Sequence, residues 1–203
     1  GDVYKRQVLM NIINAIKTGD VQRAPRLEAM LSKAIESNKQ RELTYVRQAT
    51  IDALTGCKNR RAFDNDIAAL MNDHQPFSLA LVDIDNFKTI NDTWGHLNGD
   101  IVLRNVAREG LQILQPLQIS LYRYGGEEFA VIFTTGHSDD ALKLLESWRA
   151  RVAQRSWREE GLTVTFSAGL GEWNMEPLEQ LVVRVDEALY KAKQQGKNRI
   201  VRA

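Results

Sequence analysis

Arg123–Phe133, which reads RYGGEEFAVIF, is the stretch from which the fold can be worked out. Its last five residues form an apolar run that is typical of a buried strand. The two glycines favour a turn that joins this strand to a second apolar run over Ile119–Tyr124, so the sequence predicts a β-hairpin. An ordinary hairpin would use Asn-Gly here and has no need of two adjacent carboxylates. Glu127 and Glu128 therefore indicate that the tip of the hairpin binds a positive charge.

The composition of the chain excludes several classes of protein. Of its 203 residues, 43% are hydrophobic and 26% are charged, with a net charge of +1. This suffices for one compact domain with an appendage, and it offers no large basic surface for nucleic acid or membranes. The single cysteine, Cys57, rules out a disulfide framework and a thiolate zinc site. We find no signal peptide and no apolar run long enough to span a bilayer, so we expect a cytoplasmic chain. A membrane anchor in a longer parent protein stays open.

The first 49 residues are expected to lie outside the main domain. Residues 1–7, GDVYKRQ, look like a translated sequencing adapter, although an ordinary helix start is the alternative. Residues 8–49 show helical spacing that is interrupted at residues 18–20 and resumes near Pro25. The apolar stripe is too broken to predict a coiled coil. We interpret the segment as a helical signalling linker from a missing upstream sensory domain, with a plain surface helix as the alternative.

From about residue 50 onward, helical and strand patterns alternate along the chain. The expected helices are 59–72, a hairpin of helices within 86–114, 139–154 and 178–195, and the expected strands are 77–82, 119–124, 129–133, 162–170 and 199–202. This order predicts an α+β fold of the α/β-sandwich type. Its centre is a mixed, mainly antiparallel sheet of about five strands with helices packed on it.

Acidic side chains are expected to gather at one rim of this sheet. Asp83 directly follows the expected strand 77–82. It meets Glu127 and Glu128 if that strand is the neighbour of the hairpin. Carboxylates that close raise each other's pKa unless a cation lies among them, and oxygen ligands favour Mg²⁺, with Mn²⁺ as an alternative. Gly125 and Gly126 would permit positive φ and a close approach of phosphate. A solvated acidic turn is the simpler alternative.

Adjacent residues of a regular strand point to opposite faces, so we expect Glu127 and Glu128 to have different roles.

The segment 83–100, DIDNFKTINDTWGHLNGD, is rich in polar side chains for a piece between core strands. These side chains include Lys88, Asn91, Asp92, His96, Asn98 and Asp100. An Asn and an Asp together offer the donor and acceptors that match the Watson–Crick edge of guanine, and the ammonium of Lys88 could neutralise a phosphate. The alternatives are that Asn91 and Asp92 cap a helix, that His96 is buried, and that Asp100 is the N-cap of the next helix.

Two further lysines, Lys193 and Lys197, flank Gly196 where the helix 178–195 ends. They could complement the helix dipole or bind the tail of a nucleoside triphosphate, and the sequence favours neither. The phosphate-binding loops of P-loop and dinucleotide-binding proteins and the kinase motifs are absent from the sequence.

Four blocks together resemble the GGDEF-domain diguanylate cyclases. They are DALTGCKNRR (52–61), DIDNFKTINDTWGHLNGD (83–100), RYGGEEF (123–129) and DEALYKAKQQGKNRI (186–200). The resemblance runs from about Asp52 to the end of the chain, so we expect a GGDEF catalytic domain over residues 50–203, with the GGEEF form of the motif. It implies a fold related to the polymerase palm and to class III nucleotidyl cyclases. It also implies that two GTP molecules condense to cyclic di-GMP, and that two domains must face each other as a homodimer.

The resemblance also implies a role for each candidate site residue. It assigns metal binding to Asp83, the backbone carbonyl of Ile84 and Glu127, catalysis to Glu127, Glu128 and Lys88, guanine binding to Asn91, Asp100 and His96, and phosphate binding to Lys193, Lys197, Gly125 and Gly126.

The sequence departs from the family pattern at one place. Family members with product inhibition carry an Arg-x-x-Asp motif that ends five residues before the glycines. This chain has Pro-Leu-Gln-Ile at 116–119, so we expect no tight inhibitory site there.

There are two rival functions. The first rival is a catalytically silent module that binds GTP or cyclic di-GMP, but such modules usually lose one of the acids, and all are present here. The second rival is a nucleic-acid-binding sandwich, which lacks a basic stripe here.

Overall fold

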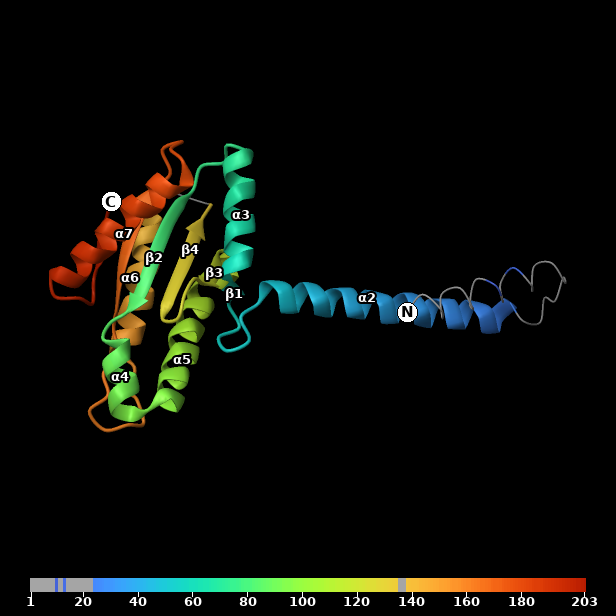
Figure 1. Cartoon of the computed structure of the whole chain (residues 1–203), viewed down its shortest axis with the longest axis horizontal. Coiled ribbons are helices and arrows are strands. Elements are labelled where there is room, and N and C mark those ends of the chain that lie inside the picture. The colour runs from blue at the N-terminus through green and yellow to red at the C-terminus, as the bar shows by residue number, and fades with distance from the viewer. Residues whose placement is uncertain (1–9, 11–12, 14–23, 135–137) are drawn as a thin grey trace. The chain divides into compact units, whose positions relative to one another are not determined.

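The computed structural model describes residues 10, 13, 24–134 and 138–203 (Figure 1). The chain divides into two units, residues 1–49 and residues 50–203, each of which is described by itself. The first unit is formed by α2 (Ala24–Thr50), which is the helix expected near Pro25. Residues 1–7, interpreted above as an adapter, lie outside the described residues, as does most of the helix expected from residue 8.

The second unit is built on a six-stranded mixed sheet. The strands are β1 (Lys58–Asn59), β2 (Ser78–Ile84), β3 (Ser120–Arg123), β4 (Glu128–Phe133), β5 (Phe166–Glu172) and β6 (Ile200–Arg202). They are ordered β1-β3-β4-β2-β5-β6, with parallel pairs only at the two edges, β1 with β3 and β5 with β6. The central pairs are antiparallel. The prediction of a mixed, mainly antiparallel sheet is therefore confirmed, with one strand more than expected.

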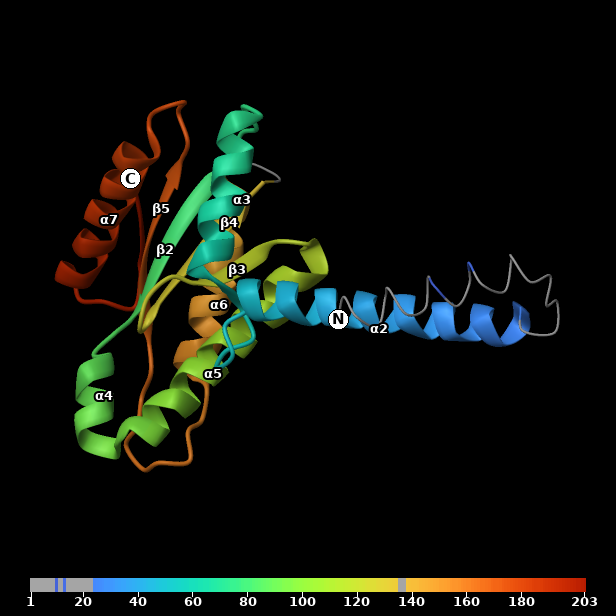
Figure 2. The same ribbon diagram turned by 45° about the vertical axis from the view of Figure 1, so that its right-hand side comes forward.

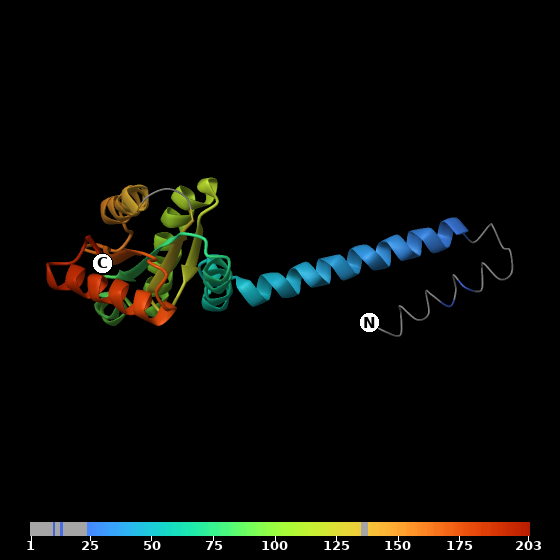
Figure 3. The same ribbon diagram turned by 90° about the horizontal axis from the view of Figure 1, so that it is seen from above.

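Helices cover both faces of this sheet. They are α3 (Arg60–Asn72), α4 (Phe87–Trp94), α5 (His96–Leu114), α6 (Ser138–Gln154) and α7 (Leu178–Gln194), with a 3-10 turn, η2 (Gln115–Leu117), after α5. Two views show α3 and α7 on one side of the sheet and α5 and α6 on the other (Figures 2 and 3). Each layer has its own cluster of buried side chains, one beneath α3 and α7 and one beneath α4, α5 and α6.

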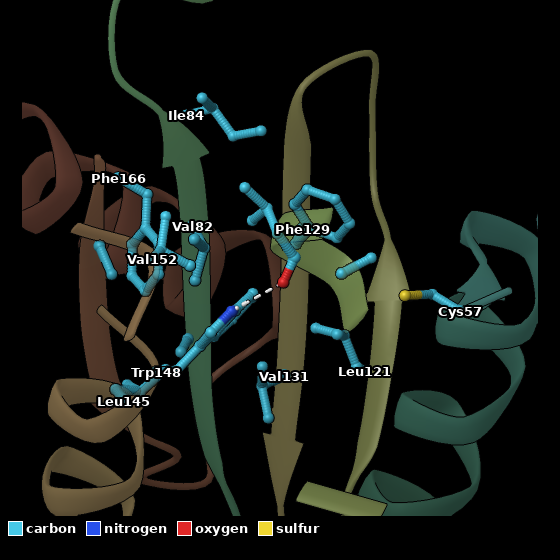
Figure 4. Packing of buried hydrophobic residues seen from close by; sticks show 14 of the residues in the cluster. Cys57, Val82, Ile84, Leu121, Phe129, Val131, Leu145, Trp148, Val152 and Phe166 are labelled. Atoms are coloured by element: carbon cyan, nitrogen blue, oxygen red, sulfur yellow. Dashed lines mark hydrogen bonds between the residues drawn. The ribbon is translucent and has the colours of Figure 1, made fainter. Parts of the chain in front are cut away.

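The larger core cluster is organised around Trp148 of α6 (Figure 4). Its indole ring is fully buried and contacts the rings of Phe129 and Phe166 from two central strands. Its Nε1 donates a hydrogen bond of 2.9 Å to the carbonyl oxygen of Val106 in α5, so the one polar atom of the ring is satisfied. This packing holds α5 and α6 against the sheet and leaves the polar strand ends at its rim.

Most element boundaries lie within two residues of the predictions, and β2 continues to Ile84, so Asp83 lies within the strand that was expected to end before it. Two differences are larger. The strand expected over 162–170 begins only at Phe166, because Leu162 and Val164 are buried without joining the ladder. Strand β1 was not predicted, since two residues, Lys58 and Asn59, carry no periodic pattern.

Candidate active site

Asp83, Glu127 and Glu128 form an acidic rim at one end of the sheet, and the pairing of β2 with β4 brings them together. Asp83 and Glu128 are directly opposite each other in this antiparallel pair, and the Ile84 amide donates to the Glu127 carbonyl at 3.4 Å. The expectation that these two strands are neighbours is therefore confirmed. Opposed residues of a strand pair point to the same face, which here is the face covered by α3 and α7.

The charges at this rim are only partly balanced. Burial is the largest cause that raises the pKa of Asp83, and Glu127 and Asp85 raise it further, against the opposing effect of Lys193. The Nζ of Lys193 lies 3.0 Å from Oδ2 of Asp83. Burial also raises the pKa of Glu128, followed by the negative charges of Asp83 and Glu127. Three carboxyl groups thus share one nearby lysine, and the site favours additional positive charge.

The two glycines of the hairpin provide space rather than an unusual backbone conformation. The expectation of positive φ is wrong, because neither glycine adopts the left-handed region. A Cβ on Gly125 would lie 2.3 Å from Oε2 of Glu128, so any side chain there would displace this carboxylate. A Cβ on Gly126 would meet nothing within 4 Å, which leaves room for a ligand above the turn.

The α4–α5 hairpin brings the candidate guanine ligands together. A Cβ on Gly99 would lie only 1.9 Å from Oδ1 of Asn91, so the Asn91 side chain lies against the residue that precedes Asp100. Lys88 is exposed one helical turn before Asn91. The N-cap of α5 is Gly95, not Asp100, and His96 is exposed. The alternatives of a capping Asp100 and a buried His96 are therefore wrong.

The turn between α7 and β6 brings the second lysine to the same end of the sheet. The Nζ of Lys197 donates a hydrogen bond to Oδ1 of Asn86, the N-cap residue of α4. The neighbouring amide of Asn198 donates to the buried carboxylate of Asp85 at 3.0 Å. No role was predicted for Asp85 or Asn86 from the sequence. The sequence Asp83-Ile84-Asp85 could have indicated a structural role for Asp85. A second acid directly after a buried strand is itself expected to be buried, and a buried carboxylate needs hydrogen-bond donors.

The rim fits a divalent cation, provided that a substrate supplies part of its ligands. Within the part of the chain that the structure describes, no group of three or more His, Cys, Asp or Glu side chains could hold a metal ion by itself. Mg²⁺, however, commonly binds through one or two carboxylates, with phosphate oxygens and water as its other ligands. Asp83 and Glu127 offer such oxygens, and the excess negative charge around them favours a cation.

Comparisons with known proteins agree with this geometry. Residues 49–199 match the family described as diguanylate cyclase, GGDEF domain. The chain belongs to this family. Among its relatives, this GGDEF domain is 40% identical over 162 residues to the diguanylate cyclase VdcA of Vibrio cholerae, a match that covers 76% of the chain and 47% of VdcA. The chain thus spans about half the length of this relative.

Two solved structures share the fold of this GGDEF protein. The coiled coil and GGDEF domain of DgcB from Caulobacter crescentus, in complex with c-di-GMP, is 32% identical with a TM-score of 0.79, covering 89% of this chain and 100% of that one. The diguanylate cyclase SiaD of Pseudomonas aeruginosa, in complex with its activator SiaC, is 30% identical with a TM-score of 0.71 and covers 100% of this chain and 87% of that one. GGDEF diguanylate cyclases are generally dependent on divalent metal ions.

A search of the described helices for one that is long and apolar enough to cross a bilayer finds none.

Proposed function

We propose that this chain is the catalytic domain of a diguanylate cyclase that condenses two GTP molecules into cyclic di-GMP and two pyrophosphates. The observation that carries the proposal is the pairing of Asp83 with Glu128 at the rim, with Glu127 beside them and Lys193 bonded to Asp83. Acids and lysines in this arrangement suit phosphoryl transfer, in which catalysis consists mainly of positioning and charge neutralisation.

In the proposed reaction, Glu127 accepts the proton of a ribose 3′-hydroxyl, and the oxygen attacks the α-phosphorus of the second GTP. A new phosphodiester bond forms and the bond to pyrophosphate breaks. The second 3′-hydroxyl then repeats the reaction and closes the ring. Glu128 supports Glu127 electrostatically, and Lys88 stabilises negative charge on the transferring phosphoryl group.

Mg²⁺ is the metal we propose for this site, with Mn²⁺ as a substitute, and the residues that would hold it are Asp83, the carbonyl of Ile84 and Glu127. When bound, the ion supplies charge neutralisation at the phosphates.

Substrate recognition is proposed to use two separate groups of side chains. Asn91 and Asp100 of the α4–α5 hairpin bind the guanine edge, with His96 as a weaker contact. Lys193 and Lys197 bind the β- and γ-phosphates beside the glycine turn formed by Gly125 and Gly126. The contacts of Lys193 with Asp83 and of Lys197 with Asn86 support this, because both ammonium groups are already held at the carboxylate end of the sheet.

The reaction requires a homodimer, because one domain holds one GTP and the two substrates must face each other. We propose that α2 helps to form it. Leu31 and Ile35 of α2 are exposed and lie one helical turn apart, while Met30 and Ala34 are half-buried. Although the pattern is too broken over the whole segment for a continuous coiled coil, these four residues form a short apolar stripe. We propose that it pairs with a second copy under the control of an upstream sensory domain. We place the reaction in the cytoplasm, where its substrate GTP is made available.

The test is incubation of the purified chain with GTP and Mg²⁺, followed by chromatography for cyclic di-GMP. We expect product from the wild type and at least a hundredfold less from Glu127→Gln, as is typical for the loss of a catalytic base. GTP bound without product would instead identify a silent binding module. The rate per domain should also fall on dilution below the dimer constant, and a constant rate would refute the dimer requirement.

A further inference from the structure

Two consecutive residues after β2 hold two consecutive residues of the α7–β6 turn. The backbone N–H of Asn198 donates a hydrogen bond of 3.0 Å to Oδ2 of Asp85. Immediately beside it, the Nζ of Lys197 donates to Oδ1 of Asn86. The candidate phosphate ligand Lys197 is therefore attached to the end of β2 by contacts on both its side chain and the backbone that follows it.

The carboxyl group of Asp85 is buried and hydrogen-bonded to three other residues. Asp85 is 4% exposed. Besides the Asn198 amide, it accepts hydrogen bonds of 2.7 Å each from Oγ1 of Thr165 and Oγ of Ser167. A carboxyl group with three such donors is well satisfied while buried, and this arrangement resembles a fixed connection between segments more than a metal ligand.

The turn that Asp85 holds has a backbone conformation that needs external support. Lys197 and Asn198 have φ angles of 62° and 48°, in the left-handed region, which is unfavourable for Lys and less so for Asn. The side chain of Asn198 is fixed from the other side by Arg149, whose Nη1 donates to its Oδ1 at 2.8 Å. These contacts restrain the turn, and we expect their loss to free Lys197 from its position beside Asn86.

We propose that Asp85 is a positioning residue that acts through the Lys197–Asn198 turn and sets the affinity of the site for the triphosphate tail of GTP. This inference rests on the proposed function. Asp85 itself does not touch the nucleotide. It keeps the ammonium of Lys197 beside Asn86, where the β- and γ-phosphates are proposed to bind.

The test compares binding of a non-hydrolysable GTP analogue with binding of GMP, which lacks the β- and γ-phosphates. In Asp85→Ala, affinity for the analogue should fall about tenfold, as expected when a hydrogen bond to a charged group is lost, while affinity for GMP stays unchanged. Lys197→Ala should give the same selective loss. The double variant should lose no more than either single one, because both changes remove the same contribution.

Two further variants separate positioning from other roles. Asp85→Asn should recover most of the affinity, because its amide oxygen can still accept from Asn198 while the rotating hydroxyl of Ser167 accepts from the amide nitrogen. If Asp85 bound the metal, Asp85→Asn would be as defective as Asp85→Ala. Ser167→Ala removes another donor to the same carboxylate but leaves the turn attached, so the ratio of the two affinities should not change.

Equal losses of analogue and GMP affinity in Asp85→Ala, or additive losses in the double variant, would overturn the inference. If Asp85→Ala does not fold, hydrogen exchange in the wild type decides: the Asn198 amide should be protected, although it lies outside the helices and strands, and rapid exchange would refute the attachment. These measurements record binding and exchange, so they stay distinct from the assay for cyclic di-GMP, whose failure would refute the proposed function instead.

Discussion

Asp83 and Glu128 face each other across β2 and β4 at the end of the sheet, and both have raised pKa values. Burial is the largest cause for each, and the charge of Glu127 adds to both. The salt bridge from Lys193 offsets only part of this effect on Asp83. Without metal and nucleotide, ionisation of these acids at neutral pH therefore opposes folding.

Replacing Glu128 with Gln should stabilise the metal-free protein at neutral pH. A carboxyl group whose pKa is raised in the folded state destabilises the protein as it ionises. The gain from Gln should therefore be present at neutral pH and be lost below the ordinary Glu pKa of 4.5, where both states are protonated. The burial of Glu128 is only partial, because the residue as a whole is exposed, so we expect less than about 1 kcal/mol. Thermal unfolding in EDTA, at neutral pH and again below pH 4.5, measures this change in stability. Glu187→Gln, on the exposed face of α7, is the control. An equal gain in the control would contradict the explanation.

Replacing Lys193 with Ala should have the opposite effect. Asp83 would lose its cationic partner while its side chain stays only 14% exposed. We expect a loss of about 1–3 kcal/mol at neutral pH, typical of a polar group left without its partner. Mg²⁺ should raise the melting temperature of this variant more than that of the wild type, because the ion replaces the missing charge. The double variant Asp83→Asn/Lys193→Ala should regain stability, and a further loss would argue against the pairing.

Replacing Asp52 with Ala should loosen the glycine hairpin. Arg123 Nη1 lies 3.2 Å from both oxygens of Asp52, and its Nη2 donates to the Gly126 carbonyl at 2.8 Å. Burial acts to raise the pKa of Asp52, but hydrogen bonds from Thr55 and the charge of Arg123 outweigh it and lower the pKa. The contribution of Asp52 is therefore present above its ordinary pKa of 3.8 and is lost as the pH falls through the lower folded-state value.

We expect Asp52→Ala to cost about 1–3 kcal/mol at neutral pH and progressively less in acid. Denaturant unfolding over a pH series measures the change, and Asp64→Ala, at an exposed position of α3, is the control. A cost that persists unchanged in strong acid would show that the ion pair is not its origin.

Cys57 should be chemically inert in the folded protein. Its side chain is 1% exposed, and burial raises its pKa to about 12. The thiolate is the reactive form, so a thiol reagent at about pH 8 should label the native protein very slowly and the unfolded protein rapidly. Colorimetric titration with and without guanidinium chloride tests this. Fast labelling of native protein would show that the segment around β1 opens readily.

Cyclic di-GMP should not bind tightly to the segment 116–119 or inhibit the proposed reaction through it. Pro116 lies in η2, and Ile119, at the position of the missing aspartate, is 6% exposed and faces the core. Neither can contact a guanine base or a phosphate as a charged side chain would. Initial rates with added product and calorimetry should detect only weak binding. Tight, non-competitive inhibition lost on substitution of Gln118 would contradict this prediction.

Much of the fold could be predicted because its strands and helices carry regular apolar patterns. The runs that became β2 and β4 are continuous because both faces are covered, and α7 keeps a clear helical stripe. Strand β1 and the start of β5 were missed because their boundaries depend on pairing with distant strands. From the residues alone, the acids and lysines could be predicted only as types suited to metal and phosphate, and their individual roles came from the resemblance to the GGDEF family.

By itself, the sequence determined which chemical groups this protein possesses and in what order, because side-chain chemistry and local periodicity are written into neighbouring residues. Only the tertiary structure decided which groups meet. It places Glu128 opposite Asp83, forms the salt bridge between Lys193 and Asp83, and bonds the buried Asp85 to the turn that carries Lys197. Those contacts join residues far apart in the chain. They depend on how the two apolar clusters pack helices and strands together, and no short stretch of sequence determines that packing.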